Sequence, residues 1–382
     1  MKAGWQTATL DEACQFINGL WKGEVPPFVR VGVIRNTNFA KNGTLDDTDI
    51  AYLDVEAKKF AKRRLQFGDI ILEKSGGGPK QPVGRVVLFD KAQGDFSFSN
   101  FTSAIRVNQP ATLDPTYLHR YLYWVYLSGR TEAMQSHSTG IRNLNGDAYK
   151  AITIAFPPIA EQRRIVAILD EAFEGIATAR VHAEKNLRNA RELSESVVEE
   201  TLTQVKSRSG EQRLGDLCQI KTGKKDVNQG NPEGQFPFFT CAAQHTYSDS
   251  YSFDTEALLV AGNGNVGQVS HYHGKFEAYQ RTYVLMGFKN VQAGYLFRAL
   301  DRRLSARVSK QKLGNTMPYI KIGMLTEFQV PVPTIEEQER ITKQLNFVTD
   351  QVQRLETAYQ AKLTALDELK QSLLHQAFSG QL

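Results

Sequence analysis

The feature that most constrains the fold is an internal repeat: residues 158–207 reappear, with changes, over residues 334–382 of the 382-residue chain. The two copies align at an offset of 176 without a gap. The residues that match at their starts are Pro157, Ile159, Glu161, Gln162, Arg164 and Ile165, then Pro333, Ile335, Glu337, Gln338, Arg340 and Ile341. A duplication of this kind predicts two similar units with a pseudo-two-fold relation.

The segments in front of the two copies also begin alike. Leu10, Cys14 and Gly19 correspond at an offset of 204 to Leu214, Cys218 and Gly223. The repeat therefore divides the chain into four parts. We name residues 1–157 head 1 and residues 208–333 head 2, and each is followed by one copy of the repeat, 158–207 or 334–382.

Each copy of the repeat is predicted to be one long helix. Its apolar residues recur at steps of mostly three and four, which is the spacing of a coiled-coil stripe. In the first copy these residues are Leu169, Ala172, Ile176, Ala179, Ala183, Leu187, Ala190, Leu193 and Val197. Helices over residues 158–207 and 334–382 would be far longer than the average globular helix of roughly 11 to 12 residues, so they are not ordinary core helices. We expect the two to pair as an antiparallel coiled coil.

The heads are predicted to be α/β. Short strand-like runs alternate with turn residues in both, and each head has one helical stretch. The strand-like runs are 69–72 and 84–89 in head 1 and 258–260 and 267–270 in head 2, and the helical stretches are 116–127 and 293–309.

The formal net charge of +5 is distributed unevenly along these parts. Head 1 carries +4 (19 Lys and Arg against 15 Asp and Glu), and head 2 carries +5 (15 against 10). The two repeat segments carry −2 each (7 against 9, and 5 against 7). Basic heads on acidic helices are expected if the heads contact a phosphate backbone and the helices contact protein.

A glycine-rich loop lies between the two strand-like runs of each head and is a candidate DNA contact. Glycines let a backbone approach a nucleic-acid strand, and basic residues flank the first loop. The candidate residues are Lys74, Ser75, Gly76, Gly77, Lys80 and Arg85 in head 1, with Asn263 and Asn265 in head 2. Gly262, Gly264 and Gly267 spell a dinucleotide fingerprint, but strand-like residues follow them where that motif needs a helix. A plain hairpin turn is the alternative interpretation.

A second polar loop precedes each long helix and supplies further candidates. Residues 138–145 correspond to residues 315–321 near the same offset of 176, and Asn and Arg are suited to contacting adenine and guanine edges. Basic residues just upstream of the second loop could face phosphates, although such a run is often only a solvated face. The candidates are Thr139, Arg142, Asn143, Thr316, Tyr319 and Lys321, with Arg307, Lys310 and Lys312.

The acidic and amide side chains of the helices are candidates for docking partner proteins. They are Glu161, Gln162, Glu195 and Glu199 in the first copy, and Glu337, Gln338 and Glu368 in the second.

The sequence contains no recognised catalytic motif. It lacks the Asp/Asn-Pro-Pro-aromatic tetrapeptide of amino-methyltransferases, and its cysteines and histidines do not have zinc spacing. Glu56 and Lys58 could be half of a nuclease motif, but the surrounding residues are dense in charge. No run approaches the ~20 apolar residues of a membrane span, and residues 1–6 lack the apolar region of a secretory signal. We expect a non-catalytic cytoplasmic protein.

Three segments carry a resemblance to a known family. They are Pro157 to Ile165 (PPIAEQRRI), its copy Pro333 to Ile341 (PTIEEQERI), and the ending Leu373 to Leu382 (LLHQAFSGQL). Over essentially its whole length the chain resembles the specificity subunit of type I restriction-modification systems. The resemblance implies two α/β target-recognition domains, residues 1–157 and 208–333, separated by two long conserved helices that form an antiparallel coiled coil.

The resemblance also implies a function and partners. Each head would recognise one half of a split double-stranded DNA site, and two modification (methyltransferase) subunits would dock along the helices. Restriction subunits would join them. S-adenosylmethionine, ATP and Mg would belong to these partners, with no cofactor in this chain. Two alternatives remain open: the recognition subunit of a related enzyme with methylation and cleavage in one partner chain, and a stand-alone DNA-bridging regulatory protein.

Overall fold

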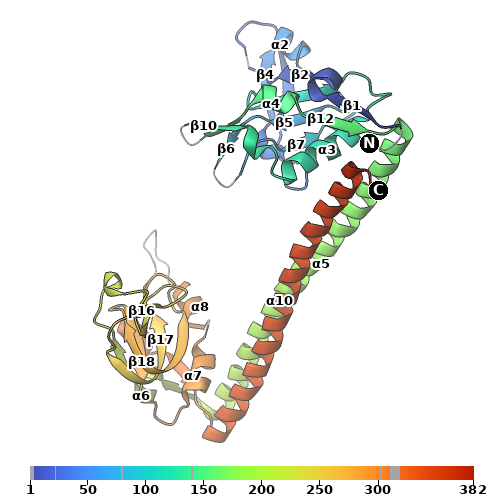
Figure 1. Ribbon diagram of the computed structural model, residues 1–382. Coiled ribbons are helices and arrows are strands. Elements are labelled where there is room, and N and C mark those ends of the chain that lie inside the picture. Colours follow the sequence, from blue (N-terminus) through green and yellow to red (C-terminus); the bar gives the residue numbers. More distant parts are fainter. Residues whose placement is uncertain (1–3, 22, 79–80, 139–140, 302, 310–318) are drawn as a thin grey trace. The chain divides into compact units, whose positions relative to one another are not determined.

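The computed structural model describes the chain except for residues 1–3, 22, 79–80, 139–140, 302 and 310–318 (Figure 1). The chain divides into two compact units. Unit 1 comprises Met1–Ala183 and Ala361–Leu382, and unit 2 comprises Glu184–Gln360. Each unit contains one head and parts of both long helices, α5 (Ile159–Ser209) and α10 (Ile335–Ser379).

Head 1 is built from four small sheets. Their strand orders are β2-β9-β5-β7, β4-β3-β8, β10-β11-β6 and β1-β12. The strands are β1 (Gln6–Thr9), β2 (Cys14–Asn18), β3 (Phe28–Ile34), β4 (Ala51–Glu56), β5 (Ile70–Glu73), β6 (Ser75–Gly77), β7 (Val86–Leu88), β8 (Phe96–Phe98), β9 (Thr102–Val107), β10 (Gln135–Ser138), β11 (Ile141–Leu144) and β12 (Thr153–Phe156). The helices are α1 (Leu10–Ala13), α2 (Ala57–Ala61), α3 (Pro115–Leu127) and α4 (Gly146–Lys150), with 3-10 turns at Asn36–Asn38 and Glu132–Met134.

Helix α3 links the β2-β9-β5-β7 sheet of head 1 to the long helices. It begins at Pro115 because Asp114 accepts hydrogen bonds from the first free backbone N–H groups, those of Thr116 and Tyr117. Its apolar side chains share one core with strands β5 and β9, with the start of α5 and with the end of α10. The core of unit 1 therefore includes residues from both ends of the chain.

Head 2 has a single large sheet of strand order β14-β19-β17-β18-β15-β16, together with the pair β13-β20. The strands are β13 (Glu211–Arg213), β14 (Gln219–Thr222), β15 (Phe236–Phe239), β16 (Thr246–Ser248), β17 (Phe253–Ala261), β18 (Val269–Ala278), β19 (Thr282–Met286) and β20 (Gln329–Pro331). The helices are α6 (Leu214–Leu217), α7 (Ala293–Leu300), α8 (Arg303–Ser309) and α9 (Ile322–Thr326), with a 3-10 turn at Val227–Gln229. One core joins α7 to this sheet, to the end of α5 and to the start of α10.

Most of the predicted elements are present, and the glycine turn of head 2 is among them. The glycines that spell the dinucleotide fingerprint form the turn between β17 and β18, where Gly264 and Gly267 have φ of +60° and +81°. A strand follows them, as expected, so no helix N-terminus is available for a pyrophosphate. One predicted element differs: the helix expected over 293–309 is two helices. Helix α7 ends at Leu300, and α8 begins at Arg303.

The long helices run antiparallel in both units. In unit 1, Arg180 of α5 pairs with Asp367 of α10, while Leu169 earlier in α5 shares a core with Leu374 later in α10. In unit 2, Arg191 pairs with Glu356 at 2.6 Å. Further along α5, Leu202 and Val205 share a core with Ile341 and Leu345. Among the described helices, none has both the length and the apolar character needed to cross a bilayer.

Candidate nucleic-acid interface

In head 1 the structure brings together the two polar segments that the sequence singled out. Strand β6 pairs with β11 in a small sheet that β10 completes (Figure 1). The backbone N–H of Leu144 donates to the carbonyl of Lys74 at 2.8 Å, and Ser75 Oγ donates to Asn143 Oδ1 at 2.6 Å. We name residues 74–77 with 141–144 corner 1. It unites six candidates: Lys74, Ser75, Gly76, Gly77, Arg142 and Asn143.

Head 2 contains an equivalent corner. The backbone N–H of Ile320 donates to the carbonyl of Gly262 at 2.8 Å, and Ile320 is the residue 176 positions after Leu144. The hydroxyl of Tyr283 also donates to the Ile320 carbonyl, at 2.8 Å. We name residues 262–265 with 319–321 corner 2. It unites the candidates Asn263, Asn265, Tyr319 and Lys321.

A cleft of about 490 Å³ opens beside corner 2. Its charged lining residues are Arg281 and Lys321, so we call it the basic cleft. The Lys321 ammonium lies 5.7 Å from the centre of the exposed Tyr319 ring. Basic and aromatic groups beside an open backbone suit a nucleic-acid strand, because they offer charge to phosphates and a stacking surface to bases. Sequence analysis missed Arg281, which no motif marks.

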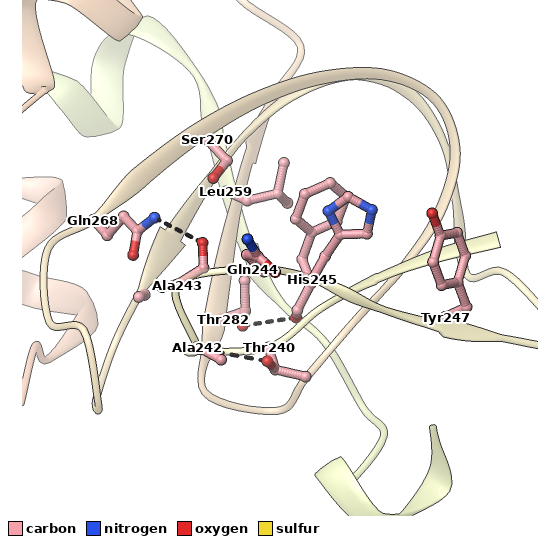
Figure 2. A pocket seen from close by; sticks show the side chains of 12 residues that line it. Thr240, Ala242, Ala243, Gln244, His245, Tyr247, Leu259, Gln268, Ser270 and Thr282 are labelled. Atoms are coloured by element: carbon pink, nitrogen blue, oxygen red, sulfur yellow. Dashed lines mark hydrogen bonds between the residues drawn. The ribbon is translucent and has the colours of Figure 1, made fainter. Parts of the chain in front are cut away.

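Head 2 also has a pocket of about 480 Å³ with a different lining (Figure 2). Its 12 lining residues include none of Lys, Arg, Asp or Glu, so we call it the uncharged pocket. They are Phe239, Thr240, Ala242, Ala243, Gln244, His245, Tyr247, Leu259, Ala261, Gln268, Ser270 and Thr282. The pocket collects residues from separate strands and loops, so no local sequence pattern marks it.

Arg85 requires a correction, because its guanidinium is engaged inside head 1. It makes two hydrogen bonds to the carboxylate of buried Glu73, at 2.7 and 2.8 Å, and donates to the carbonyls of Phe39 and Asn36 at 3.2 Å. Asn36 in turn donates to Glu73 and to the carbonyl of Ser75. Arg85 therefore supports corner 1 through Glu73 and Asn36, and only 17% of its side chain is exposed.

Two other candidates of corner 1 also have structural roles. Gly77 is buried, and a Cβ at this position would lie 2.6 Å from the carbonyl oxygen of Gln81, which excludes any larger residue. The Lys74 ammonium donates to Asn18 Oδ1 at 3.0 Å, and burial lowers the pKa of Lys74. Gly76 is exposed, with φ of +102°.

Several candidates cannot be placed at either corner. Arg307 is exposed on α8, where its guanidinium lies 5.2 Å from the centre of the Phe328 ring, and it lines neither the basic cleft nor the uncharged pocket. Lys80, Thr139, Lys310, Lys312 and Thr316 lie outside the described residues.

The glutamines proposed for partner docking also require a correction. Gln162 and Gln338 are fully buried. Gln162 accepts from the Asp114 N–H and donates to the carbonyls of Thr112 and Pro157, at 2.7 to 2.8 Å. Such side chains fasten a helix to a head and offer no surface to a partner.

Gln338 makes the same set of contacts in unit 2. It accepts from the Gln292 N–H at 2.8 Å and donates to the carbonyls of Asn290 and Pro333 at 3.0 and 2.9 Å. We call each set a glutamine clamp.

The proposed docking glutamates lie nearer the surface. Glu161 and Glu337 pair with Arg164 and Arg340 one turn later in the same helix. Glu199 pairs with Arg303 of head 2 at 3.2 Å, and Glu195 and Glu368 are exposed.

Apolar side chains on the same helices are also exposed. Leu193 of α5 and Phe347 of α10, both in unit 2, are 60% and 65% exposed, and Leu355 of α10 is exposed as well. At 100° per residue, Phe347 lies 120° and 160° from the buried Ile341 and Leu345 of α10, whereas Leu355 lies 40° from Ile341, on the side of that buried stripe. Exposed apolar side chains are typical of protein interaction sites, and Phe347 is the one that faces away from the buried stripe.

No three His, Cys, Asp or Glu side chains among the described residues are grouped in a way that could hold a metal ion.

Comparisons with known proteins point in one direction. The family model described as "Type I restriction modification DNA specificity domain" matches residues 2–186 and again residues 207–365. The type I restriction enzyme EcoDI specificity subunit of Escherichia coli is 36% identical over 169 residues, which is 44% of this chain and 37% of that protein. The chain thus spans well under two thirds of this relative's length.

Two solved structures share the fold. A chain from a study of complex assembly and conformational transition of the type I R-M system has a TM-score of 0.82 at 20% identity, covering 100% of this chain and 99% of that one. The HsdS subunit from Thermoanaerobacter tengcongensis has a TM-score of 0.62 at 18% identity, covering 100% and 98%.

Proposed function

The chain belongs to the type I restriction-modification DNA-specificity family, and on that premise we propose that each head binds one half of a split double-stranded DNA site. The observation that carries the proposal is the pair of equivalent corners. Both corners contain the same backbone hydrogen bond, from Leu144 to Lys74 in head 1 and from Ile320 to Gly262 in head 2. Half-buried polar side chains lie beside the first bond, and the exposed side chains of Asn265, Tyr319 and Lys321 lie beside the second.

The distribution of charge supports this proposal. The heads carry +4 and +5, and the two repeat segments carry −2 each. Binding to phosphates releases counterions in proportion to the number of contacts, so basic heads give affinity that falls as salt rises. The two corners have different side chains, which fits two half-sites of unlike sequence.

We infer that the long helices dock two modification subunits and, through them, restriction subunits. Exposed Leu193, Phe347 and Leu355 support this inference more strongly than the acidic residues do, because apolar surface supplies most of the free energy of stable association. Glu195 would border that surface, and Glu368, which is in unit 1, remains a separate docking candidate. Glu199 is a weaker candidate, since it already pairs with Arg303.

Docking can be tested by changing the exposed apolar surface. Phe347→Asp should weaken co-purification with the modification subunit at least tenfold, because it places a charge in a desolvated contact. Phe347→Leu keeps an apolar side chain and should retain assembly. Equal assembly by both variants would show that docking lies elsewhere.

We propose further that the chain is non-catalytic and cytoplasmic, and that S-adenosylmethionine, ATP and Mg act in the partner subunits. The sequence supports this by lacking the methyltransferase tetrapeptide. In the host, co-expression of the full chain with its modification subunit should methylate one two-part sequence with an unspecified spacer. The purified chain alone should transfer no labelled methyl group to the same DNA. Methyl transfer by the chain alone would contradict the proposal.

A further inference from the structure

The uncharged pocket and the basic cleft adjoin the same end of the head 2 sheet. Thr282 lines the pocket, and the next residue of β19, Tyr283, lines the cleft. In the same way, Ala261 at the end of β17 lines the pocket, and Gly262, the next residue, lines the cleft. Because successive strand residues point to opposite faces, the pocket and the cleft flank the two faces of one sheet end.

This geometry matches the spacing of features on duplex DNA. Stacked sheets lie on the order of 10 Å apart, so one sheet with its side chains is about that thick, and the major groove is about 12 Å wide. A duplex that covers the end of the sheet can therefore place a phosphate strand at Arg281 and Lys321 while a base edge faces the uncharged pocket. The pocket lining has no Lys or Arg, which argues against a phosphate there.

The pocket is held rigid by hydrogen bonds from its surroundings. The backbone N–H of Asn265, in corner 2, donates to the Cys241 carbonyl at 3.0 Å. Gln268 Nε2 donates to the Ala243 carbonyl at 3.3 Å, and Thr282 Oγ1 donates to the Phe239 carbonyl at 3.0 Å (Figure 2). A preformed recognition surface loses little conformational entropy on binding.

Gln244 is the residue of the pocket best placed to contact a base. It is exposed, and its amide makes no hydrogen bond with the described part of the chain. His245 beside it lies against Phe239, with ring centres 5.2 Å apart, and Tyr247 lies 5.4 Å from His245. An aromatic wall next to a glutamine amide offers both an apolar contact and a donor–acceptor pair.

We propose that Gln244 reads an adenine edge in the half-site bound by head 2. A glutamine amide donates to adenine N7 and accepts from N6 in a bidentate pair that no other base offers in the major groove. Gln268 acts as a positioning residue, because it fixes the loop that carries Gln244. The inference rests on the proposed function and adds to it the residue that sets one base of the specificity.

The test uses the full chain in complex with its modification subunit and sequences the methylated bases of host DNA. Gln244→Ala should relax one base pair in one half of the motif and lower discrimination there roughly 5- to 150-fold. Gln244→Glu should move the preference at that position from adenine to cytosine, because a carboxylate accepts from cytosine N4. A loss of fold or assembly cannot produce such a switch.

Binding to duplexes at several salt concentrations gives a second readout. Gln244→Ala should leave the salt dependence unchanged, whereas Arg281→Ala should reduce its slope by about one phosphate contact without changing the motif. Gln219→Ala is the matched control, since Gln219 is exposed and pairs with Met286 at the other end of β19. It should change neither property.

The outcomes separate this inference from the proposed function. If both Gln244 variants methylate the unaltered motif, or if intact complexes of both lose all methylation, the assignment of Gln244 is wrong while the two-part motif of the unsubstituted complex still stands. If the unsubstituted complex methylates no two-part sequence, the proposed function itself fails.

Discussion

Gln162 in unit 1 and Gln338 in unit 2 make the same three hydrogen bonds, whereas the two corners share one backbone hydrogen bond and differ in their side chains. A second matched pair lies beside the clamps: the hydroxyls of Tyr117 and Tyr295 donate to the carbonyls of Ala155 and Pro331. The attachment of each head to its helices is thus the same, whereas the side chains of the two corners differ.

The comparison has a physical explanation. A buried backbone group without a partner costs roughly 1–3 kcal/mol, so a side chain that closes several such groups is hard to replace. An exposed side chain is free of that constraint, since water satisfies whatever it leaves unpaired. Two heads can therefore differ in what they recognise while they are attached in the same way.

The sheets show how far the heads differ. In head 2, β18 is one strand of 10 residues that joins the pairs formed by β17 and β15 into a single sheet. In head 1, β7 and β8 have 3 residues each and belong to separate sheets.

The largest effect is expected where a long helix ends in a head. Phe378 packs edge-on against Tyr117 and Tyr121, with ring centres 5.4 and 5.3 Å apart, and Leu202 occupies the equivalent position in unit 2. Phe378→Ala should cost about 3–5 kcal/mol and Leu202→Ala about 2–5 kcal/mol, each in its own unit. Urea unfolding followed by segment-resolved hydrogen exchange measures both. Leu369→Ala, at an exposed position of α10, should cost less than about 0.5 kcal/mol. If Leu369→Ala lost as much stability as the other two variants, the comparison of Phe378 with Leu202 would have no support.

The glutamine clamps should give the next largest effect. Gln162→Leu leaves the Asp114 N–H and two carbonyls without partners, and Gln338→Leu does the same in unit 2. Each should destabilise its own unit by about 2–4 kcal/mol, with the two values within about 1 kcal/mol of each other because the partners are equivalent. Exposed Gln371→Leu on α10 is the control. Unequal costs for the two clamps would break the comparison.

Substitutions at equivalent positions of the two corners should have different effects on stability. Asn143→Ala removes a side chain that accepts from Ser75 in corner 1, and we expect it to cost ~1–3 kcal/mol of discrimination at one base pair. It should also destabilise head 1 by about 1 kcal/mol. Tyr319→Ala, at the equivalent position of corner 2, should leave stability within about 0.5 kcal/mol because its ring is exposed. Duplex binding and urea unfolding of both variants measure these effects. Equal stability losses in the two variants would contradict the prediction.

The smallest effect concerns Lys370, which has no basic counterpart in unit 2, where Ser194 is equivalent. Its ammonium lies near the rings of Tyr123 and Phe173, 4.7 and 4.8 Å from their centres. Burial, with a smaller contribution from the charge of Arg120, lowers the pKa of Lys370 to about 8.

The sign of the pH dependence follows from that shift. Between about pH 8 and the ordinary lysine pKa, the unfolded chain binds more protons than the folded one, so stability rises with pH. The wild type should therefore gain stability relative to Lys370→Met as pH rises through this range. Thermal unfolding at several pH values measures the difference, and a constant difference would show that Lys370 is not perturbed.

The sequence predicted the parts that repeat regularly and not those that depend on distant contacts. The long helices follow from apolar residues at steps of three and four. Gln162 was misassigned to the surface because a polar residue in a first helical turn usually faces solvent. Its burial depends on Thr112 and Asp114, which approach from a separate loop.

The site was predictable to a similar extent. Corner 1 was predicted as two separate loops, but their meeting depends on the pairing of β6 with β11. Arg85 was misassigned because a basic residue after a glycine loop suggests a phosphate contact, and its partner Glu73 lies on the adjacent strand. The uncharged pocket combines segments near residues 240, 261, 268 and 282, so no local pattern marks it.

The two heads are attached alike, and we propose that they recognise DNA independently. The most direct test exchanges residues 208–333 for the corresponding head of a relative and sequences the methylated bases in a host that also expresses the modification subunit. One half of the methylated sequence should change while the other half stays as it was. A change in both halves, or a single continuous motif, would contradict it.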